Sequence, residues 1–281
     1  MDKRAKIYAV VNRKGGVGKT TTAVTLGHGL AKKLEGQGHV LIVDLDPQGN
    51  VATSLGLKAE GQDIAGVLTG EVSVEEAVLH ADRSRSGGPS RSNLWVLPAS
   101  DALADAKLTL VANAALSSVL DQFGGRTVKA VPTDQLLQTY LAKAVATFDY
   151  IVLDCPPSLD MLGTAIYHFA DEAVVPVKVD YLGVGGAARH TQDIIEAQAA
   201  GINIKVGVIV PTFVRAREVL ARQMLSALID SYGKSRVAVP IPQSVVVEQA
   251  PASGGLTVFE YAPDSVPAQA YWRLVEKVYN G

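Results

Sequence analysis

The sequence predicts an α/β fold in a single domain, with a doubly wound parallel sheet flanked by helices. Short apolar runs rich in valine, isoleucine and leucine alternate with helical patterns of about 15 residues, which is typical of a parallel sheet covered on both faces. Hydrophobic residues make up 48% of the 281 residues and aromatic residues 6%, so small aliphatic side chains are available for a large core. No linker or repeat divides the chain, and we predict one domain over 1–281.

Seven apolar runs are expected to form the strands. Each one ends close to Gly, Pro or Asp, as buried strands of a parallel sheet commonly do. They lie at 7–11, 40–43, 94–98, 150–154, 173–177, 205–210 and 237–240.

Apolar residues at helical spacing predict the helices between these strands. The helices are expected at 19–34, 64–68, 74–79, 101–120, 133–147, 187–200, 217–231 and 264–279. In the last of them Tyr271, Leu274, Val275 and Val278 share one face, which we expect to dock on the body of the domain. The segment 82–93 is rich in Gly, Pro and Ser and is predicted to be a mobile surface loop.

The run KGGVGKTT follows the first predicted strand and opens the first helix. Its three glycines leave backbone N–H groups able to converge on phosphate oxygens, and the helix N-terminus adds unpaired donors. In such a loop Lys19 can reach the β- and γ-phosphates, and the Thr20 hydroxyl can bind Mg²⁺. The sequence therefore predicts a nucleoside triphosphate site. Its residues are Lys14, Gly15, Gly16, Val17, Gly18, Lys19, Thr20 and Thr21.

Aspartates follow two of the predicted strands, at the strand ends where α/β sheets place their ligands. Alternation puts Asp44 and Asp46 on the same side if the strand stays extended that far. The alternative is a pair of turn-forming aspartates before a proline. Asp154 ends a buried strand in the Walker B pattern, beside the predicted Mg²⁺ or its water, and a diproline turn follows it.

The loop departs from the usual G-x-x-x-x-G-K-[ST] pattern, because Arg13 occupies the first glycine position and Lys14 adds a second lysine. It resembles the deviant Walker A box of the ParA/MinD family, K-G-G-x-G-K-[ST], and the resemblance runs from Ile7 to about Val278. The resemblance implies ATP/ADP and Mg²⁺ as cofactors. It also implies an ATP-dependent homodimer in which Lys14 touches the phosphates bound by the other subunit. A solvated loop lysine is the alternative for Lys14.

The same resemblance implies roles for residues outside the loop. Asp46 falls in the A′ motif (switch I) and would orient or activate the attacking water, while Asp44 would support the metal's water shell. Thr212 and Pro242 fall where the family lays its adenine base. The implied catalytic residues are Lys14, Lys19 and Asp46. The implied metal site consists of Thr20, Asp44 and Asp154.

The function implied by the resemblance is that of a ParA-type partition or positioning ATPase. Such a protein hydrolyses ATP, binds DNA without sequence preference, and moves a plasmid, chromosome or organelle with a ParB-like adaptor that stimulates hydrolysis. It would work in the cytoplasm on the nucleoid. A MinD-like membrane switch is the alternative. A small-molecule ligase or synthetase is a third possibility, and it would need a second pocket with polar groups.

Charge and cysteine content narrow these choices. The net charge of −2 does not indicate nucleic-acid binding by the whole chain, so a DNA surface must be a local patch or be assembled by dimerisation. Many relatives have Pro-Arg-Asn-Val-Arg where this chain has PQSVV from Pro242, which removes an arginine that contributes to DNA binding in the family.

A single cysteine, Cys155, excludes an iron–sulfur reductase and is expected to be buried. No apolar run reaches the ~18 residues that a membrane span requires. Membrane binding by the helix 264–279 is not favoured, because its apolar face is expected to dock on the body and only Arg273 and Lys277 offer charge for lipid headgroups. The candidate DNA contacts are the arginines of 82–93, Lys3, Arg4, Lys6, Arg215, Arg217, Arg222, Lys234, Arg236, Arg273 and Lys277.

Overall fold

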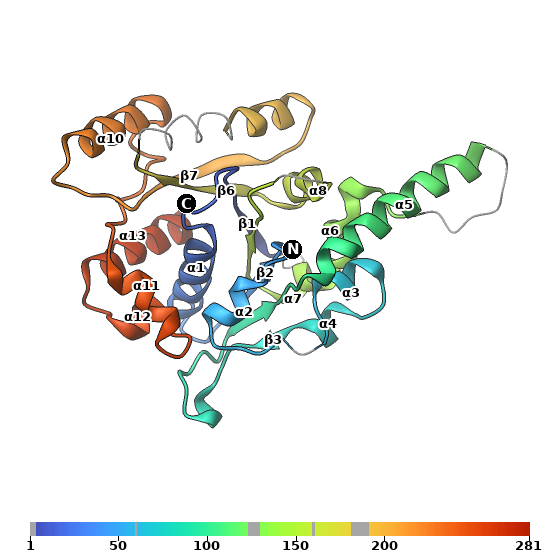
Figure 1. The fold of residues 1–281 in the computed structure, drawn as a ribbon, viewed down its shortest axis with the longest axis horizontal. Coiled ribbons are helices and arrows are strands. Elements are labelled where there is room, and N and C mark those ends of the chain that lie inside the picture. The colour runs from blue at the N-terminus through green and yellow to red at the C-terminus, as the bar shows by residue number, and fades with distance from the viewer. Residues whose placement is uncertain (1–3, 60, 123–129, 159–160, 181–190) are drawn as a thin grey trace.

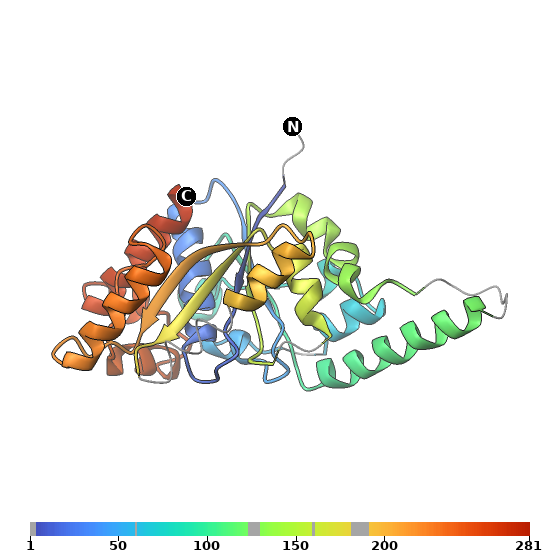
Figure 2. The ribbon, with the colours of Figure 1, turned by 90° about the horizontal axis from the view of Figure 1, so that it is seen from above.

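A seven-stranded sheet with helices on both faces forms the centre of the computed structural model, which describes residues 4–59, 61–122, 130–158, 161–180 and 191–281 (Figures 1 and 2). The strands lie in the order β3-β4-β2-β5-β1-β6-β7, and all neighbours are parallel except β3 and β4. The predicted α/β class is therefore confirmed. The strands are β1 (Lys6–Val10), β2 (Val40–Asp44), β3 (Leu79–His80), β4 (Leu94–Leu97), β5 (Tyr150–Asp154), β6 (Glu172–Lys178) and β7 (Lys205–Thr212).

Helices of very different lengths cover the sheet. They are α1 (Lys19–Lys33), α2 (Asn50–Ser54), α3 (Ile64–Thr69), α4 (Val74–Ala77), α5 (Ala102–Gln122), α6 (Leu136–Tyr140), α7 (Ala142–Thr147), α8 (Leu162–Phe169), α10 (Val219–Tyr232), α11 (Val245–Ala252), α12 (Val258–Tyr261) and α13 (Val266–Asn280), with single 3₁₀ turns η1 (Ser84–Ser86) and η2 (Thr133–Gln135). Residues 191–199 are helical as well, within the predicted helix 187–200, whose first residues lie outside the described ranges. The outer end of α5 extends away from the rest of the domain (Figure 1).

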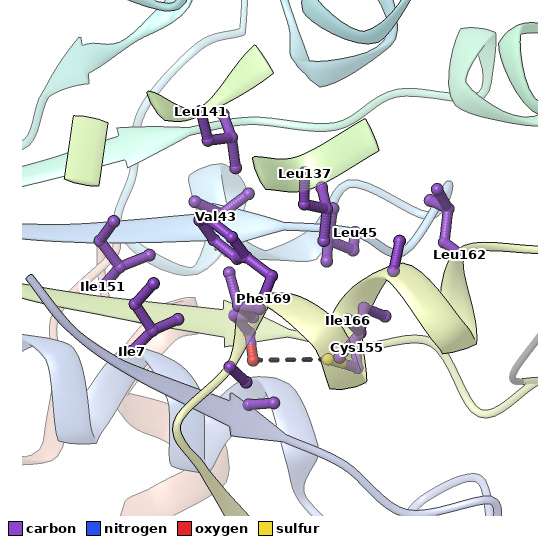
Figure 3. Close-up of a cluster of buried hydrophobic side chains, with 14 of the residues drawn as sticks. Ile7, Val43, Leu45, Leu137, Leu141, Ile151, Cys155, Leu162, Ile166 and Phe169 are labelled. Atoms are coloured by element: carbon purple, nitrogen blue, oxygen red, sulfur yellow. Dashed lines mark hydrogen bonds between the residues drawn. The ribbon is translucent and has the colours of Figure 1, made fainter. Parts of the chain in front are cut away.

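The alternation of side chains along β1 supplies two separate cores. Ile7 and Ala9 belong to one, while Tyr8 and Val10 belong to the other. In the first core, Leu137 of α6 and Phe169 of α8 pack with residues of the central strands (Figure 3). Cys155 lies in this core too, where its Sγ is 3.7 Å from the carbonyl oxygen of Leu153 and burial raises its pKa, as expected for a structural cysteine.

The helix α13 closes the second core. Tyr271, Leu274 and Val275 are buried, and α13 packs along α1. The approach is close enough that a Cβ on Gly29 of α1 would collide with Val275. The Tyr8 hydroxyl donates a hydrogen bond to the Val278 carbonyl at 3.0 Å, which joins the last helix to β1. The apolar face of α13 is therefore docked on the body of the domain, as predicted.

The segment 237–240, predicted to be the seventh strand, does not form one. Val237 forms one isolated parallel bridge with Ile209 of β7, and a second isolated bridge joins Val214 to Pro242, beyond the ends of β7 and of this segment. Pro240 has no N–H to donate, so a continuous ladder cannot pass this position. The seventh strand is instead the short β3, which pairs antiparallel with β4 at the sheet edge.

Two other expectations are corrected by the packing. The predicted helix over 133–147 is divided, with Leu141 at φ −100° and ψ 12° between α6 and α7.

The prediction of a surface loop over 82–93 is wrong for Arg91, whose side chain is 0% exposed. A guanidinium at that depth requires several acceptors, which this loop brings together with residues far along the chain. Arg91 is therefore unavailable to DNA.

Candidate nucleotide-binding site

The predicted phosphate loop has the expected strand-loop-helix setting. β1 ends at Val10, and α1 begins at Lys19, directly after Gly18. Gly16 has φ 67° and Gly18 has φ 87°, both in the left-handed region that side chains disfavour. These two glycines let the chain reverse and present consecutive N–H groups at the N-terminus of α1, where an anion is favoured.

Lys19 lies at the centre of this loop. It is 8% exposed, and its Nζ donates to the Lys14 carbonyl at 3.3 Å. Burial lowers the pKa of Lys19, whereas the nearby charges of Asp154 and Asp46 act in the opposite direction. The structure therefore brings Lys19 close to two of the three aspartates that the sequence singled out, Asp154 and Asp46.

Asp44 and Asp154 lie side by side, because they are paired in the register of β2 and β5. Burial raises the pKa of Asp44 to about 6, although it accepts hydrogen bonds from the N–H groups of Asp46 and Val51 at 3.0 Å. Both of its oxygens are thus used to hold the segment that follows β2. Burial raises the pKa of Asp154 to about 8; the charge of Asp44 adds to this rise, and the Thr20 hydroxyl and Lys19 oppose it.

The residues around Asp154 fit a Mg²⁺ ion. Asp154 is 1% exposed, and neither of its oxygens accepts a hydrogen bond of normal geometry from the described residues. A cation would offset the burial and the repulsion that hold the pKa of this carboxyl so high. The Thr20 hydroxyl is close enough to affect the same carboxyl, and hydroxyl and carboxylate oxygens are the ligands that Mg²⁺ prefers.

A turn, and not an extension of β2, places Asp46 at this site. The strand β2 ends at Asp44, so alternation does not extend to Asp46. Asp46 instead begins a turn, in which its carbonyl accepts from Gly49 N–H and its Oδ1 accepts from Gln48 N–H at 3.1 Å. Its carboxylate is half-buried at the carboxyl edge of the sheet, where it is open to a water molecule.

A cavity of about 150 Å³ adjoins the loop where the base was expected. Thr212 and Pro242 both line it, together with Gly18. The Thr212 hydroxyl donates to the Val17 carbonyl at 2.9 Å, which fixes β7 to the phosphate loop. Phe213 also lines the cavity, and its φ of 54° is unusual for an aromatic residue. Sequence patterns do not report backbone angles, so this residue was missed.

Lys14 is held within its own subunit. Its Nζ lies 3.0 Å and 3.2 Å from the two carboxylate oxygens of Asp180, and its N–H donates to Asn12 Oδ1 at 2.9 Å. The preceding residue, Arg13, pairs with Asp193 at 2.8 Å. Neither Asp180 nor Asn12 was predicted, because no sequence spacing relates them to the loop.

Comparison with known proteins agrees with this geometry. A family model described as an AAA domain (AAA_31) matches residues 5–208. The chain is 34% identical to the "Chromosome-partitioning ATPase Soj" of Thermus thermophilus, covering 98% of this chain and 96% of that one. It is 31% identical to the protein of the same name from Treponema pallidum, over 97% of this chain and 96% of that one.

Solved structures share the fold. A structure titled cobyrinic acid a,c-diamide synthase from Mycobacterium smegmatis, with bound ATP analog and magnesium, is 27% identical with a TM-score of 0.72 and covers 98% of this chain and 95% of that chain. An ATP complex of McdA from Cyanothece is 22% identical, with a TM-score of 0.77 and coverage of 99% and 97%. From its phosphate loop, its family match and its Soj relatives, the chain belongs to the AAA-domain family of P-loop ATPases that contains the chromosome-partitioning ATPases of the Soj/ParA type.

Proposed function

We propose that this protein is a Mg²⁺-dependent ATPase that dimerises with ATP, binds DNA without sequence preference and positions a cargo in the cytoplasm, on the nucleoid. A ParB-like adaptor on a chromosome, plasmid or organelle would stimulate its hydrolysis. The observation that carries the proposal is the convergence of Lys19, Asp46 and Asp154 on one phosphate loop. Asp154 is paired in register with Val10 at the end of β1, and Leu45, which precedes Asp46, donates its N–H to the Asp154 carbonyl at 2.9 Å. The Soj relatives support the partition role.

Each residue of the site has a task in this proposal. The N–H groups of Gly15 to Gly18 hold the phosphate oxygens, and Lys19 neutralises their charge. Thr20 and Asp154 would hold the Mg²⁺ ion, which offsets charge on the phosphates when bound. Asp46 orients the attacking water, and positioning is the main requirement because the transition state of phosphoryl transfer is loose. Lys14 would contact the nucleotide of the second subunit.

The proposal is tested by DNA binding with ATP and with ADP across a salt series. Phosphate contacts release counterions, so affinity is expected to fall steeply with salt in the ATP state and to be weak with ADP. Anionic liposomes form the parallel arm. Binding to vesicles rather than to DNA would favour the MinD-like alternative, although the apolar face of α13 is buried. None of the described helices combines the length and apolar character required to cross a membrane.

The Asp46→Ala variant is expected to bind ATP and form a stable dimer while hydrolysis falls about 100-fold or more, since a positioned carboxylate commonly contributes that much. Phosphate release and sedimentation of the same sample would measure both properties. Asp105→Ala is the matched control, because Asp105 is an exposed carboxylate on α5. Hydrolysis by Asp46→Ala at the wild-type rate would remove Asp46 from the mechanism.

Arg217 and Arg222 are the basic residues that we expect to contact DNA. Both are exposed around the start of α10, whereas Arg4 and Lys6 are paired with acidic residues. The double variant Arg217→Ala/Arg222→Ala should weaken ATP-dependent DNA binding and lower the slope of log K against log salt by about 1 for each arginine that binds a DNA phosphate. Lys143→Ala, which removes an exposed lysine of α7, should leave both unchanged. An unaltered slope in the double variant would exclude this surface.

A small-molecule ligase or synthetase is the second candidate function. The observation in its favour is a cavity of about 580 Å³ between α3 and α5, whose lining includes the polar side chains of Gln62, Asn113 and Tyr140. This is the second pocket that such an enzyme would need. Intact ATP binding without any ATP-dependent DNA binding in the salt series would favour this candidate over a partition ATPase.

A further inference from the structure

We propose that Asp180 is a positioning residue that retains Lys14 in its own subunit, so that ATP-dependent pairing of two subunits has to draw Lys14 away from it. This inference rests on the proposed role of Lys14 across the dimer. The structural observation is the contact of Lys14 Nζ with both Asp180 oxygens, at 3.0 and 3.2 Å. The side chains are 30% and 36% exposed, so a competing phosphate can reach the ammonium.

The two partners are held by the same part of the sheet. Asp180 lies two residues after the end of β6. The residue between, Val179, donates its N–H to the Thr212 carbonyl at 3.0 Å. Asn12 is 2% exposed; its Nδ2 donates to the Pro176 carbonyl of β6 at 2.7 Å, and its Oδ1 accepts from Lys14 N–H. The backbone of Lys14 and the carboxylate of Asp180 are therefore both positioned by β6. The ion pair of Lys14 and Asp180 is therefore supported on both sides by contacts with β6.

The groups around the ion pair also allow Lys14 to leave Asp180 for another anion. Lys178 Nζ lies 3.6 Å from Asp180 Oδ2, so the carboxylate keeps a cation when Lys14 leaves. The same Lys178 lies over the ring of Phe213, 5.8 Å from its centroid, beside the cavity expected to take the base. Lys14 can thus move to another anion while Asp180 keeps Lys178 as a neighbouring cation.

Removing the Asp180 carboxylate is expected to change the dissociation constant of the ATP-bound dimer only modestly. Partly exposed ion pairs contribute little, and removing one corresponds to about a two- to fivefold change in an equilibrium constant. Asp180 would therefore not prevent dimerisation. It would set the ATP-bound protein concentration at which pairs form.

The first measurement is dimer dissociation by analytical ultracentrifugation with Mg²⁺ and a non-hydrolysable ATP analogue. Asp180→Asn should lower the dissociation constant about two- to fivefold. Asp180→Glu, which keeps the charge, should behave like the wild type. Glu172→Gln is the matched control, since it removes the carboxylate of an ion pair with Lys6 at the other end of the same strand. Weaker or unchanged pairing of Asp180→Asn would overturn the proposal.

The second measurement does not depend on dimerisation. The rate at which an amine-reactive ester labels Lys14 in the monomer, read by mass spectrometry, should rise several-fold in Asp180→Asn and stay constant in Glu172→Gln. Unchanged labelling would overturn the inference, whatever the dimer does. If the wild type binds the analogue by calorimetry but stays monomeric, the proposed dimer fails instead. In that case faster labelling would show that Asp180 holds Lys14, while its role in pairing would be refuted.

Discussion

Replacing Lys19 with alanine is expected to abolish ATP binding in the micromolar range. The ammonium lies among the carboxylates at the base of the loop and is positioned to neutralise the phosphates. Truncating one partner of a buried, hydrogen-bonded charge pair costs about 2–5 kcal/mol, which lowers affinity at least roughly 30-fold. Without that cation the bound triphosphate would also face Asp154 and Asp46 directly. Isothermal titration calorimetry with Mg²⁺ and a non-hydrolysable ATP analogue measures this loss.

Lys14→Ala, at the other lysine of the loop, provides the comparison for Lys19→Ala. Lys14 is paired with Asp180 in its own subunit, so Lys14→Ala should bind the analogue with nearly wild-type affinity as a monomer and fail to pair. Circular dichroism would confirm that both variants are folded. Nucleotide affinity unchanged in Lys19→Ala would contradict the phosphate contact, and an intact analogue-bound dimer of Lys14→Ala would contradict its role across the interface.

Replacing Arg91 with alanine is expected to lower the free energy of unfolding by about 3–5 kcal/mol, the cost of breaking a buried ion pair from one side. Its Nε and Nη2 donate to the two carboxylate oxygens of Glu260 at 2.9 and 2.7 Å, and its Nη1 donates to the Leu55 carbonyl at 2.9 Å. Nη2 also donates to the Gly255 carbonyl at 2.7 Å. The variant would leave a largely buried carboxylate and two carbonyl groups without these donors.

Urea unfolding followed by circular dichroism measures this change. Arg85→Ala is the control, because Arg85 is an exposed arginine in the same loop, and it should change stability by less than about 0.5 kcal/mol. A loss below about 1 kcal/mol in Arg91→Ala would show that the ion pair is not required by the fold.

The parts of the site that could be predicted are those that depend on local sequence. The glycines and Lys19 of the loop act through neighbours in the chain, and Asp154 is the last residue of a strand whose apolar run predicts that it is buried. Asp44 and Asp154 were placed at one sheet edge because parallel strands end together, and the register of β2 and β5 puts them opposite each other. The order of the strands themselves could not be obtained from periodicity.

The contacts that could not be predicted join residues far apart in sequence. Asp180 meets Lys14 only because β6 lies beside β1, and Arg91 finds Glu260 only because α12 packs near the loop after β3. Composition suggested that a Gly-, Pro- and Ser-rich segment would not be packed, yet Arg83, Arg91 and Asn93 all donate hydrogen bonds to carbonyl groups of distant segments. Similarly, the Val-Ala-Val run at 237–239 has strand propensity, but the following proline cannot continue the ladder.

The docking of α13 on α1 and β1 has a consequence for biosynthesis. The first strand and the first helix are synthesised well before α13, the helix that encloses them. Until residues 266–280 have left the ribosome, the apolar side of α1 that they cover stays open to water and to chaperones. Contacts between such distant parts of a chain form slowly. The nascent protein is therefore expected to reach its protease-resistant state only after residues 266–280 have emerged from the ribosome.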